Sequence, residues 1–412
     1  MADFMQHGAI TTVHDLGTAQ RDRLEAMLRV VTRRYRIGLI LPVTAADLRA
    51  EPFARIVGEL EGADYIEQIV VALGSAPVPE DFQEALRAVA RLGDKAQVLW
   101  TDGPRFDRLY QSLGEAGLDL STPGKGRSVW TAFGYMLANP RLQAFALHDC
   151  DIVNYQREML ARLCLPIVHP GLDFEFCKAY YARCTDRLYG RVVRLLVVPL
   201  LRTMIATFGP HPFLTYLESF RYPLSGEFAV TNTLARSNRV PSDWGLEVGT
   251  LAEVFRNTSL KRVCQVDICR AYEHKHQDLS AADPGKGLMR MAVDILTSVF
   301  RTVAGMGLAF QPGHFPTLRC AYLRSAQDAI RQYHADALIN GLLLDRHEEE
   351  QTVEAFAQRI TEAGERFLQD PSGGPATPNW TRVYAALPEF PQKLVEAVAA
   401  DRAECVGGSH QP

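Results

Sequence analysis

The amino-acid sequence predicts an α/β fold with a parallel sheet, followed by a helical C-terminal extension. Two observations carry this prediction. In the first 150 residues, short apolar runs alternate with segments whose apolar residues recur at helical spacing. From residue 284 onward, amphipathic segments follow one another with few strand signals. Strands that alternate with helices are typical of a parallel sheet, which places this chain in the α/β class.

The α/β part is predicted to begin after a short helix rich in arginine. Continuous apolar runs suit strands that are buried on both faces, and proline or glycine ends several of them. The predicted strands span residues 37–42, 66–73, 97–100 and 144–147. The predicted helices span residues 22–35, 49–60, 80–92 and 128–137. The densest apolar run, residues 195–201, is too short to cross a bilayer.

The C-terminal part is predicted to be helical. Its expected helices span residues 288–304, 321–344, 348–367 and 390–404, with a Pro/Gly-rich loop at 371–378. We therefore expect an N-terminal helical extension (1–35), an α/β domain (36–283), a helical C-terminal region (284–405) and a disordered tail (406–412).

Composition limits the class of protein without naming a function. Of 412 residues, 44 are Lys or Arg and 48 are Asp or Glu, which gives a net charge of −4. That charge argues against a nucleic-acid binder, whose affinity rests on basic surfaces. The first 20 residues contain no apolar segment of a signal peptide, and the eight cysteines form no C-x-x-C pair. We therefore expect a cytoplasmic protein with reduced thiols, no structural zinc and no transmembrane segment.

Four residues follow predicted strands directly. Pro42 and Ser75 end the first two, while Asp149 and Asp151 come after the fourth. In parallel sheets, ligands bind at the carboxyl ends of the strands. Two carboxylates spaced in this way suit a ribose or water on one side and a divalent cation bound to a diphosphate on the other. The alternative is a pair of solvated loop acids or a helix cap.

Two basic segments are candidate anion sites. Lys125 lies in a Gly-Lys-Gly loop before a helix, where the backbone can approach a phosphate. Gly190 and Arg191 open another helical stretch. An ordinary turn is the alternative for the first segment, and arginines that extend from a helix to solvent are the alternative for the second.

Three further segments combine acids, aromatic residues and histidines. Glu227 follows the glycine of a Pro-Leu-Ser-Gly-Glu segment, and Trp244 and Glu247 belong to Asp-Trp-Gly-Leu-Glu. An indole suits the face of a sugar, and a carboxylate suits its hydroxyls. His274 and His276 are candidate metal ligands near residue 275. Solvated helix-face carboxylates and a polar turn are the alternatives.

The order of these motifs resembles the retaining GT-A glycosyltransferases that make glucosyl-3-phosphoglycerate, with the mannosylglycerate synthases as relatives. The resemblance covers residues 37–277, and residues 223–247 are its most specific part. It implies a GT-A fold, which is the Rossmann-like fold of nucleotide-diphospho-sugar transferases. The family's catalytic set would correspond to Lys125, Asp149 and Glu247. Its donor-binding set would comprise Pro42, Ser75, Lys125, Asp149, Glu227, Trp244 and Glu247.

The resemblance also implies a metal site and an acceptor site. Asp151 and His274 would bind Mg²⁺ or Mn²⁺, with His276 as a rival for His274. The acceptor would contact Gly190, Arg191 and Leu224.

Two departures from the family pattern leave the substrates open. Residues 43–46 lack the family's acidic pair, so the donor base stays open between uracil and guanine. Val193 stands where the phosphoglycerate enzymes have threonine, so free D-glycerate is an alternative acceptor.

The function expected from this resemblance is metal-dependent transfer of glucose or mannose, with retention, from a nucleotide sugar to 3-phosphoglycerate or D-glycerate. The product would be a compatible solute or its precursor, and a second copy of the chain is an expected partner because homodimers are common in the family. Two alternatives come from other classes. One is a sugar nucleotidyltransferase, and the other is a non-catalytic α/β scaffold with a degenerate nucleotide site.

Overall fold

In the computed structural model, which describes residues 6, 8–17, 20–120, 122–241, 246–274, 287–373 and 377–407, eight strands form one sheet. Their order across the sheet is β1-β8-β6-β7-β5-β2-β3-β4. The strands are β1 (Thr11–Val13), β2 (Arg36–Thr44), β3 (Ile66–Gly74), β4 (Ala96–Trp100), β5 (Leu142–Leu147), β6 (Phe176–Tyr181), β7 (Phe228–Thr231) and β8 (Val263–Cys269). The four strands predicted from apolar runs correspond to β2, β3, β4 and β5.

The strands predicted from the alternating pattern, β2 to β5, pair in parallel as expected, while the complete sheet is mixed. Strand β7 runs antiparallel to both of its neighbours, β5 and β6, and the other described strand pairs are parallel. The reason is local. The chain leaves β6, passes through helices and re-enters the sheet from the edge at which the parallel strands end, so that β7 begins where they stop.

Successive apolar side chains of the central strands point to opposite faces of the sheet and form a hydrophobic core on each face. Leu39 and Leu41 belong to one buried cluster and Ile40 to the other. In a strand, successive side chains point to opposite faces, which explains why an apolar run becomes a central strand. Helices that contribute to the first cluster are α1 (Arg21–Val31), α2 (Ala45–Leu48), α3 (Glu51–Glu61), α4 (Pro79–Val89) and α7 (Arg157–Val168).

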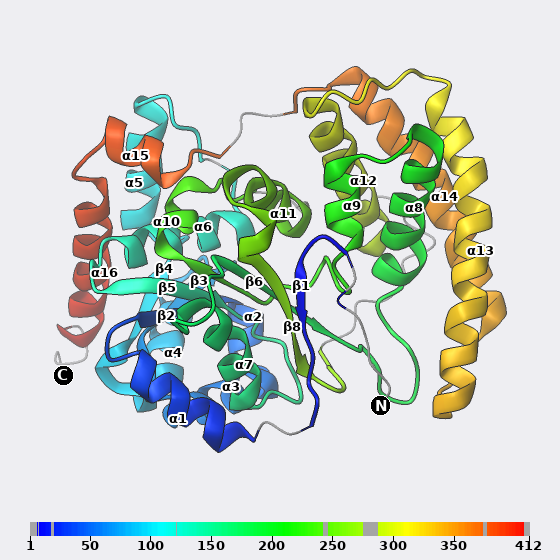
Figure 1. Ribbon diagram of the computed structural model, residues 1–412. Helices are drawn as coiled ribbons and strands as arrows, with labels where there is room; N and C mark the ends of the chain where they lie inside the picture. Colours follow the sequence, from blue (N-terminus) through cyan, green and yellow to red (C-terminus); the bar gives the residue numbers. More distant parts are fainter. Residues whose placement is uncertain are drawn as a thin grey trace.

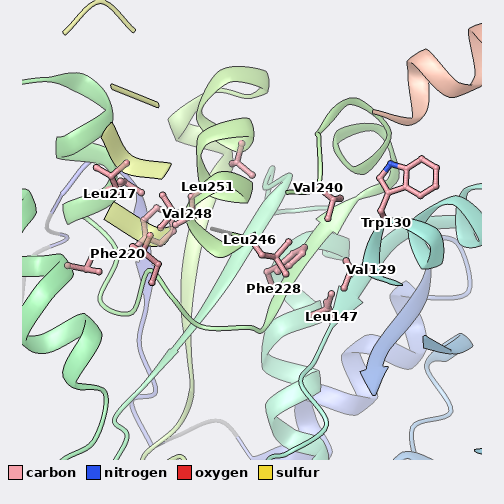
Figure 2. Packing of buried hydrophobic residues seen from close by; sticks show 14 of the residues in the cluster. Val129, Trp130, Leu147, Leu217, Phe220, Phe228, Val240, Leu246, Val248 and Leu251 are labelled. Carbon is pink, nitrogen blue, oxygen red and sulfur yellow. The ribbon is translucent and has the colours of Figure 1, made fainter. Parts of the chain in front are cut away.

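The second cluster is larger because most of the remaining helices share it. Figure 2 shows part of it, where Phe228 of β7 lies near Val129 and Leu246. The helices that contribute are α5 (Pro104–Glu115), α6 (Lys125–Leu137), α8 (Val198–Phe208), α9 (Pro212–Glu218), α10 (Asn232–Ser237), α11 (Leu246–Asn257), α12 (Gly287–Gly305), α13 (His314–Asn340), α14 (Arg346–Gln369), α15 (Trp380–Ala386) and α16 (Phe390–Gly407). A π-helical segment, η2 (Val192–Val197), leads into α8. Among the described helices, none has the length and apolarity that crossing a membrane requires.

The helical C-terminal region divides into two groups on opposite sides of the molecule (Figure 1). Helices α12, α13 and α14 pack against one another and against η2, and α13 also packs against α8. Helices α15 and α16 lie beside α5 and α6, where Trp380 stacks on Trp130 with ring centroids 4.1 Å apart. The chain thus returns to the sheet layer after building the separate bundle.

The N-terminal segment also differs from a purely helical extension. Besides α1, which packs on α7, it contains β1, which pairs with β8 at the edge of the sheet. The three-residue strand β1 lacks a long apolar run, so the sequence pattern did not indicate it.

The carboxyl ends of the parallel strands lie along one side of the sheet, where a ligand can bind. The parallel strands β2, β3, β5, β6 and β8 all end there, and β7 begins there. This is the position at which α/β sheets bind ligands.

Candidate active site

A cavity of about 1680 Å³ opens at this edge of the sheet. Ten of the twelve predicted site residues line it: Pro42, Ser75, Lys125, Asp149, Asp151, Gly190, Arg191, Leu224, Glu247 and His274. Trp244 and the rival histidine His276 lie outside the described residues. Glu227 is the exception among the described ones, because its side chain is fully buried behind the wall.

The end of the cavity near β2 and β3 carries acids that the sequence analysis missed. Ser75 follows β3 in the left-handed conformation, with φ of 51°. Thr44 caps the short helix α2 in a capping box, in which the Asp47 carboxylate accepts a hydrogen bond from the backbone N–H of Thr44, and it also accepts one from Thr44 Oγ1 at 2.6 Å. Asp102 accepts a hydrogen bond from Arg127 at 2.8 Å. Asp47 and Asp102 both line the cavity, so this end carries carboxylates although residues 43–46 contain none.

A lysine between two carboxylates occupies the centre of the cavity. Lys125 begins α6, and its Nζ lies 2.6 Å from Asp149 Oδ1 and 3.8 Å from Glu247 Oε1. Asp149 follows β5, and Glu247 lies in the first turn of α11. Three elements that are distant in sequence therefore place one positive and two negative charges together.

The pKa values of Lys125, Asp149 and Glu247 shift for different reasons. Burial alone would raise the pKa of Asp149, but the adjacent Lys125 charge outweighs it and holds that pKa below its usual value. Burial would lower the pKa of Lys125, but attraction by Asp149 and Glu247 raises it. Burial raises the pKa of Glu247, and the positive charges of Lys125 and Lys178 offset only part of this rise. Lys125 is thus a permanent cation.

The Pro-Leu-Ser-Gly-Glu segment (residues 223–227) packs against the Asp149 carboxylate. A Cβ atom on Gly226 would overlap the carboxylate of Asp149, so only glycine allows the close approach. Glu227 accepts hydrogen bonds from Tyr181 Oη at 2.7 Å and from Tyr272 Oη at 2.6 Å. These two rings stack with centroids 3.7 Å apart.

Glu227 does not reach the cavity in this structure, and its predicted contact with the donor stays a prediction. Its carboxylate oxygens are taken up by the two tyrosines, and none of its surface is exposed. Burial raises the pKa of Glu227, and the nearby Asp149 raises it further. Tyr181 and Tyr272, unlike Glu227, line the cavity, so Glu227 is linked to the cavity wall through these two hydroxyl groups.

Asp151 and His274 form the candidate metal pair. Asp151 Oδ2 lies 3.5 Å from His274 Nδ1, and a β-bridge between Ile152 and His274 joins the two segments. In the part of the chain that the structure describes, no cluster of three or more His, Cys, Asp or Glu side chains is arranged for a metal. Two protein ligands fit a Mg²⁺ or Mn²⁺ ion that takes its other ligands from water and substrate phosphates.

The opposite end of the cavity is rich in arginine. Gly190, with φ of 74°, and Arg191 begin the segment that continues as η2. Leu224 and Tyr222 also line the cavity, and the Tyr222 ring lies next to Gly190. Arg191 is already ion-paired with two acids of α14, at 2.8 Å to Glu348 and 2.8 Å to Glu349.

The acids of α14 were missed by the sequence analysis. They lie more than 150 residues from Arg191 in the chain, as part of an ordinary acidic first turn of a helix. No local spacing pattern connects a helix N-terminus to an arginine so far upstream. Only the packing of α14 against η2 brings them together.

Comparison with known proteins places this geometry in a family. No family model matches the chain. A glucosyl-3-phosphoglycerate synthase of Persephonella marina is 46% identical over 404 residues, which is 98% of this chain and 100% of that protein. One of Methanococcoides burtonii is 39% identical over 97% of this chain and 98% of that protein.

Solved structures agree on the fold. The glucosyl-3-phosphoglycerate synthase of Mycobacterium tuberculosis, crystallised with Mn²⁺, UDP-glucose and phosphoglyceric acid, aligns with a TM-score of 0.52 at 21% identity, covering 72% of this chain and 88% of that one. Its complex with Mg²⁺ and UDP aligns with a TM-score of 0.51 at 22% identity, covering 72% and 87%. The predicted GT-A fold with a helical C-terminal region is confirmed.

The similarity to the two curated relatives is not confined to the residues of the cavity. The two full-length relatives match both the α/β part and the C-terminal helices, so the whole chain, and not the sheet alone, is shared with them. From its full-length relatives and its fold, the chain belongs to the glucosyl-3-phosphoglycerate synthase family of glycosyltransferases.

Proposed function

We propose that this glycosyltransferase transfers glucose from UDP-glucose to 3-phosphoglycerate with Mg²⁺ or Mn²⁺ as its metal. The observation that carries the proposal is one cavity with Lys125, Asp149 and Glu247 at its centre, the Asp151–His274 pair beside them and Arg191 at its far end. The M. tuberculosis enzyme was crystallised with the same donor, acceptor and metals.

The charges of the cavity suggest how each residue acts. Lys125 offers a fixed positive charge to the donor diphosphate, and Asp149 holds that lysine in place through its 2.6 Å contact. Glu247 and Asp149 offer oxygen acceptors to hydroxyls of the sugar or ribose. Asp151 and His274 would hold the metal. When bound, a divalent cation neutralises charge on the leaving diphosphate.

The proposed reaction retains the configuration of the sugar. The acceptor hydroxyl attacks the anomeric carbon from the side of the leaving group, the bond from that carbon to the diphosphate oxygen breaks, and the proton passes to the leaving phosphate. No enzymic nucleophile is then needed. Glu227 is unsuited to a double displacement because it is fully buried behind two tyrosines, which leaves Glu247 as the carboxylate for that alternative.

A matrix of donors and acceptors tests the proposal. UDP-glucose, GDP-glucose and GDP-mannose are offered with 3-phosphoglycerate, D-glycerate and D-lactate, with Mg²⁺ or Mn²⁺ present. We expect the highest kcat/KM for UDP-glucose with 3-phosphoglycerate. A better turnover of D-glycerate would transfer the proposal to the non-phosphorylated acceptor, and no glycoside from any pair would refute it.

The biological setting is part of the same proposal. We propose a cytoplasmic reaction whose product is a compatible solute or its precursor. The predicted homodimer is supported by exposed apolar side chains near the end of α13, namely Leu338, Ile339 and Leu343. Light scattering should give twice the chain mass of 45.9 kDa.

A further inference from the structure

Lys178 of β6 is a buried lysine that lies behind the cavity wall. Only 1% of its surface is exposed, although lysine is almost never fully buried in proteins without a partner. Its Nζ donates a hydrogen bond to the carbonyl of Ser225 at 2.6 Å and lies 5.7 Å from the centre of the Phe228 ring. Because burying an ammonium group is costly, the position of Lys178 requires an explanation in the surroundings of that group.

Hydrogen bonds of Ser225 join β6 to the segment that precedes β7. Lys178 donates to the carbonyl of Ser225, and Ser225 Oγ donates to the carbonyl of Ala179 at 2.7 Å. The next residue, Gly226, lines the cavity at the point where a Cβ atom would overlap the carboxylate of Asp149. Lys178 therefore helps to fix the backbone against which Asp149 packs.

The charges around Lys178 come from four elements. They are Lys125 of α6, Asp149 after β5, Glu227 before β7 and Glu247 of α11. The residues that pair with Lys178 on the neighbouring strands, Phe228 and Gln265, carry no charge. Helix α7 packs on the opposite face of β6, on the side of Cys177. Three carboxylates thus share the charges of two lysines.

Without the charge of Lys178, the three carboxylates would share one lysine. Like charges that are close together favour protonation of one of them. Lys178 lowers the pKa of Glu247 and so opposes the effect of burial on that group. Burial lowers the pKa of Lys178 itself to about 8, so Lys178 is charged at neutral and acidic pH. A protonated Glu247 would lose acceptor capacity for the hydroxyls of a donor sugar.

We propose that Lys178 is a positioning residue of the transfer reaction, which fixes the backbone at Ser225 and Gly226 and keeps Glu247 ionised for the donor sugar. The inference rests on the proposed function, in which Glu247 contacts the donor. Lys178 acts through these residues because its own side chain does not line the cavity. Its loss should therefore affect the donor and leave binding of the acceptor near Arg191 unchanged.

Three substitutions of Lys178 separate its charge from its hydrogen bond. Lys178→Arg keeps both, Lys178→Gln keeps a hydrogen-bond donor without the charge, and Lys178→Met removes both. The control is Lys95→Met. Lys95 ends the 3₁₀-helical segment 90–95, is half-buried and also donates to backbone carbonyls, those of Leu60 and Ala63, but it does not line the cavity.

The readout is the pH dependence of kcat/KM for UDP-glucose, which reports the ionisation of groups in the free enzyme. In Lys178→Gln and Lys178→Met, we expect the acidic limb of this profile to move to higher pH by about one unit, because Glu247 binds its proton more tightly. Lys178→Arg and Lys95→Met should keep the wild-type limb. The acceptor KM should stay within about twofold of the wild-type value in all four variants.

A lysine with only a structural role gives a different result. Loss of packing lowers kcat/KM equally at every pH and leaves the acidic limb in place, and that outcome in the neutral variants overturns the inference. Because glutamine retains a donor for the Ser225 carbonyl, Lys178→Gln keeps the test valid if Lys178→Met does not fold. Wild-type turnover of UDP-glucose and 3-phosphoglycerate is measured first. Its absence refutes the proposed function, whereas an active enzyme whose limb does not respond to the charge of residue 178 overturns this inference alone.

Discussion

Asp149 and Asp151 are separated by one residue and yet contact different partners. Asp149 pairs with Lys125, and Asp151 faces His274. The sequence spacing predicted two carboxylates at a strand end, but it did not determine which partner each would contact, because both partners are distant in the chain. The metal role of Asp151 and His274 stays a prediction.

His274 provides a direct test of the metal pair. Replacing it with alanine removes one of two protein ligands, so the Mn²⁺ concentration for half-maximal activity should rise at least about 10-fold. His276→Ala is the matched comparison, since His276 was the rival from sequence. Activity titrated with Mn²⁺ measures both variants. A larger effect of His276→Ala would assign the metal to that residue.

His148, which precedes Asp149, should make the free energy of unfolding fall at acidic pH. His148 is fully buried, and burial lowers its pKa from 6.5 to about 4. Since the unfolded chain binds a proton at higher pH than the folded chain, the contribution of His148 is complete above pH 6.5 and is lost as the pH falls to about 4. His148→Phe should therefore reduce the loss of unfolding free energy between pH 7 and pH 5 by about 2 kcal/mol.

Denaturant unfolding at both pH values measures this difference. The variant and the wild-type chain share all other titrating groups, so only the difference between their pH responses is attributed to His148. An identical loss of stability in the two proteins would contradict a neutral, buried His148.

At the scale of elements, α14 connects the C-terminal bundle to the acceptor end of the cavity. Its first turn supplies Glu348 and Glu349, and the second of these is buried between Arg191 and Arg194. The backbone N–H of Leu343, just before α14, also donates to the carbonyl of Asp186 at 2.7 Å. The helical region is therefore part of the site's framework and not a separate appendage.

Two neighbouring glutamates of α14 should behave differently. Glu349→Gln leaves the buried Arg194 without its acid, which should lower the free energy of unfolding by about 3 kcal/mol. It should also raise the acceptor KM, because the half-buried Arg191 loses the buried acid that fixes its position and keeps only the exposed Glu348. Glu348 is half exposed, so Glu348→Gln should change stability by less than about 1 kcal/mol. It should also lower the acceptor KM, because it removes a competing anion from Arg191. Equal effects of the two substitutions would contradict this account.

The sequence predicted those elements whose patterns are local and strong. The apolar runs that became β2 and β3 and the amphipathic segment that became α14 were correctly predicted. Strand β7 has four residues, and β8 mixes cysteines and polar residues, so neither has a distinct period. The antiparallel direction of β7 follows from the path of the chain, which no local pattern contains.

As with the helices and strands, only part of the candidate site could be predicted from the sequence. Residues at strand ends and helix starts, such as Asp149 and Lys125, carried recognisable motifs. Glu348 and Glu349 did not, because their contacts with Arg191 join elements that are far apart in sequence. Glu227 carried a motif, but its burial behind Tyr181 was not visible in the sequence.

At the scale of the whole molecule, one sheet edge organises the protein. Strand ends supply the central acids, two helix starts supply Lys125 and Glu247, and the C-terminal bundle completes the arginine-rich end. The near-neutral net charge of −4 agrees with this arrangement, since basic and acidic side chains both line the cavity and anions would be bound by local charges such as Lys125 and Arg191. Family membership favours a glycosyltransferase over the nucleotidyltransferase and scaffold alternatives.

We propose that this cavity transfers glucose to an anionic acceptor. The most direct test of this proposal is NMR analysis of UDP-glucose and 3-phosphoglycerate incubated with the purified chain and Mn²⁺, with the Asp151→Ala variant in parallel. We predict equal amounts of UDP and a glucoside of 3-phosphoglycerate with the donor's α configuration, and no turnover by Asp151→Ala. Pyrophosphate release, or no glucoside in the presence of Mn²⁺, would contradict the account.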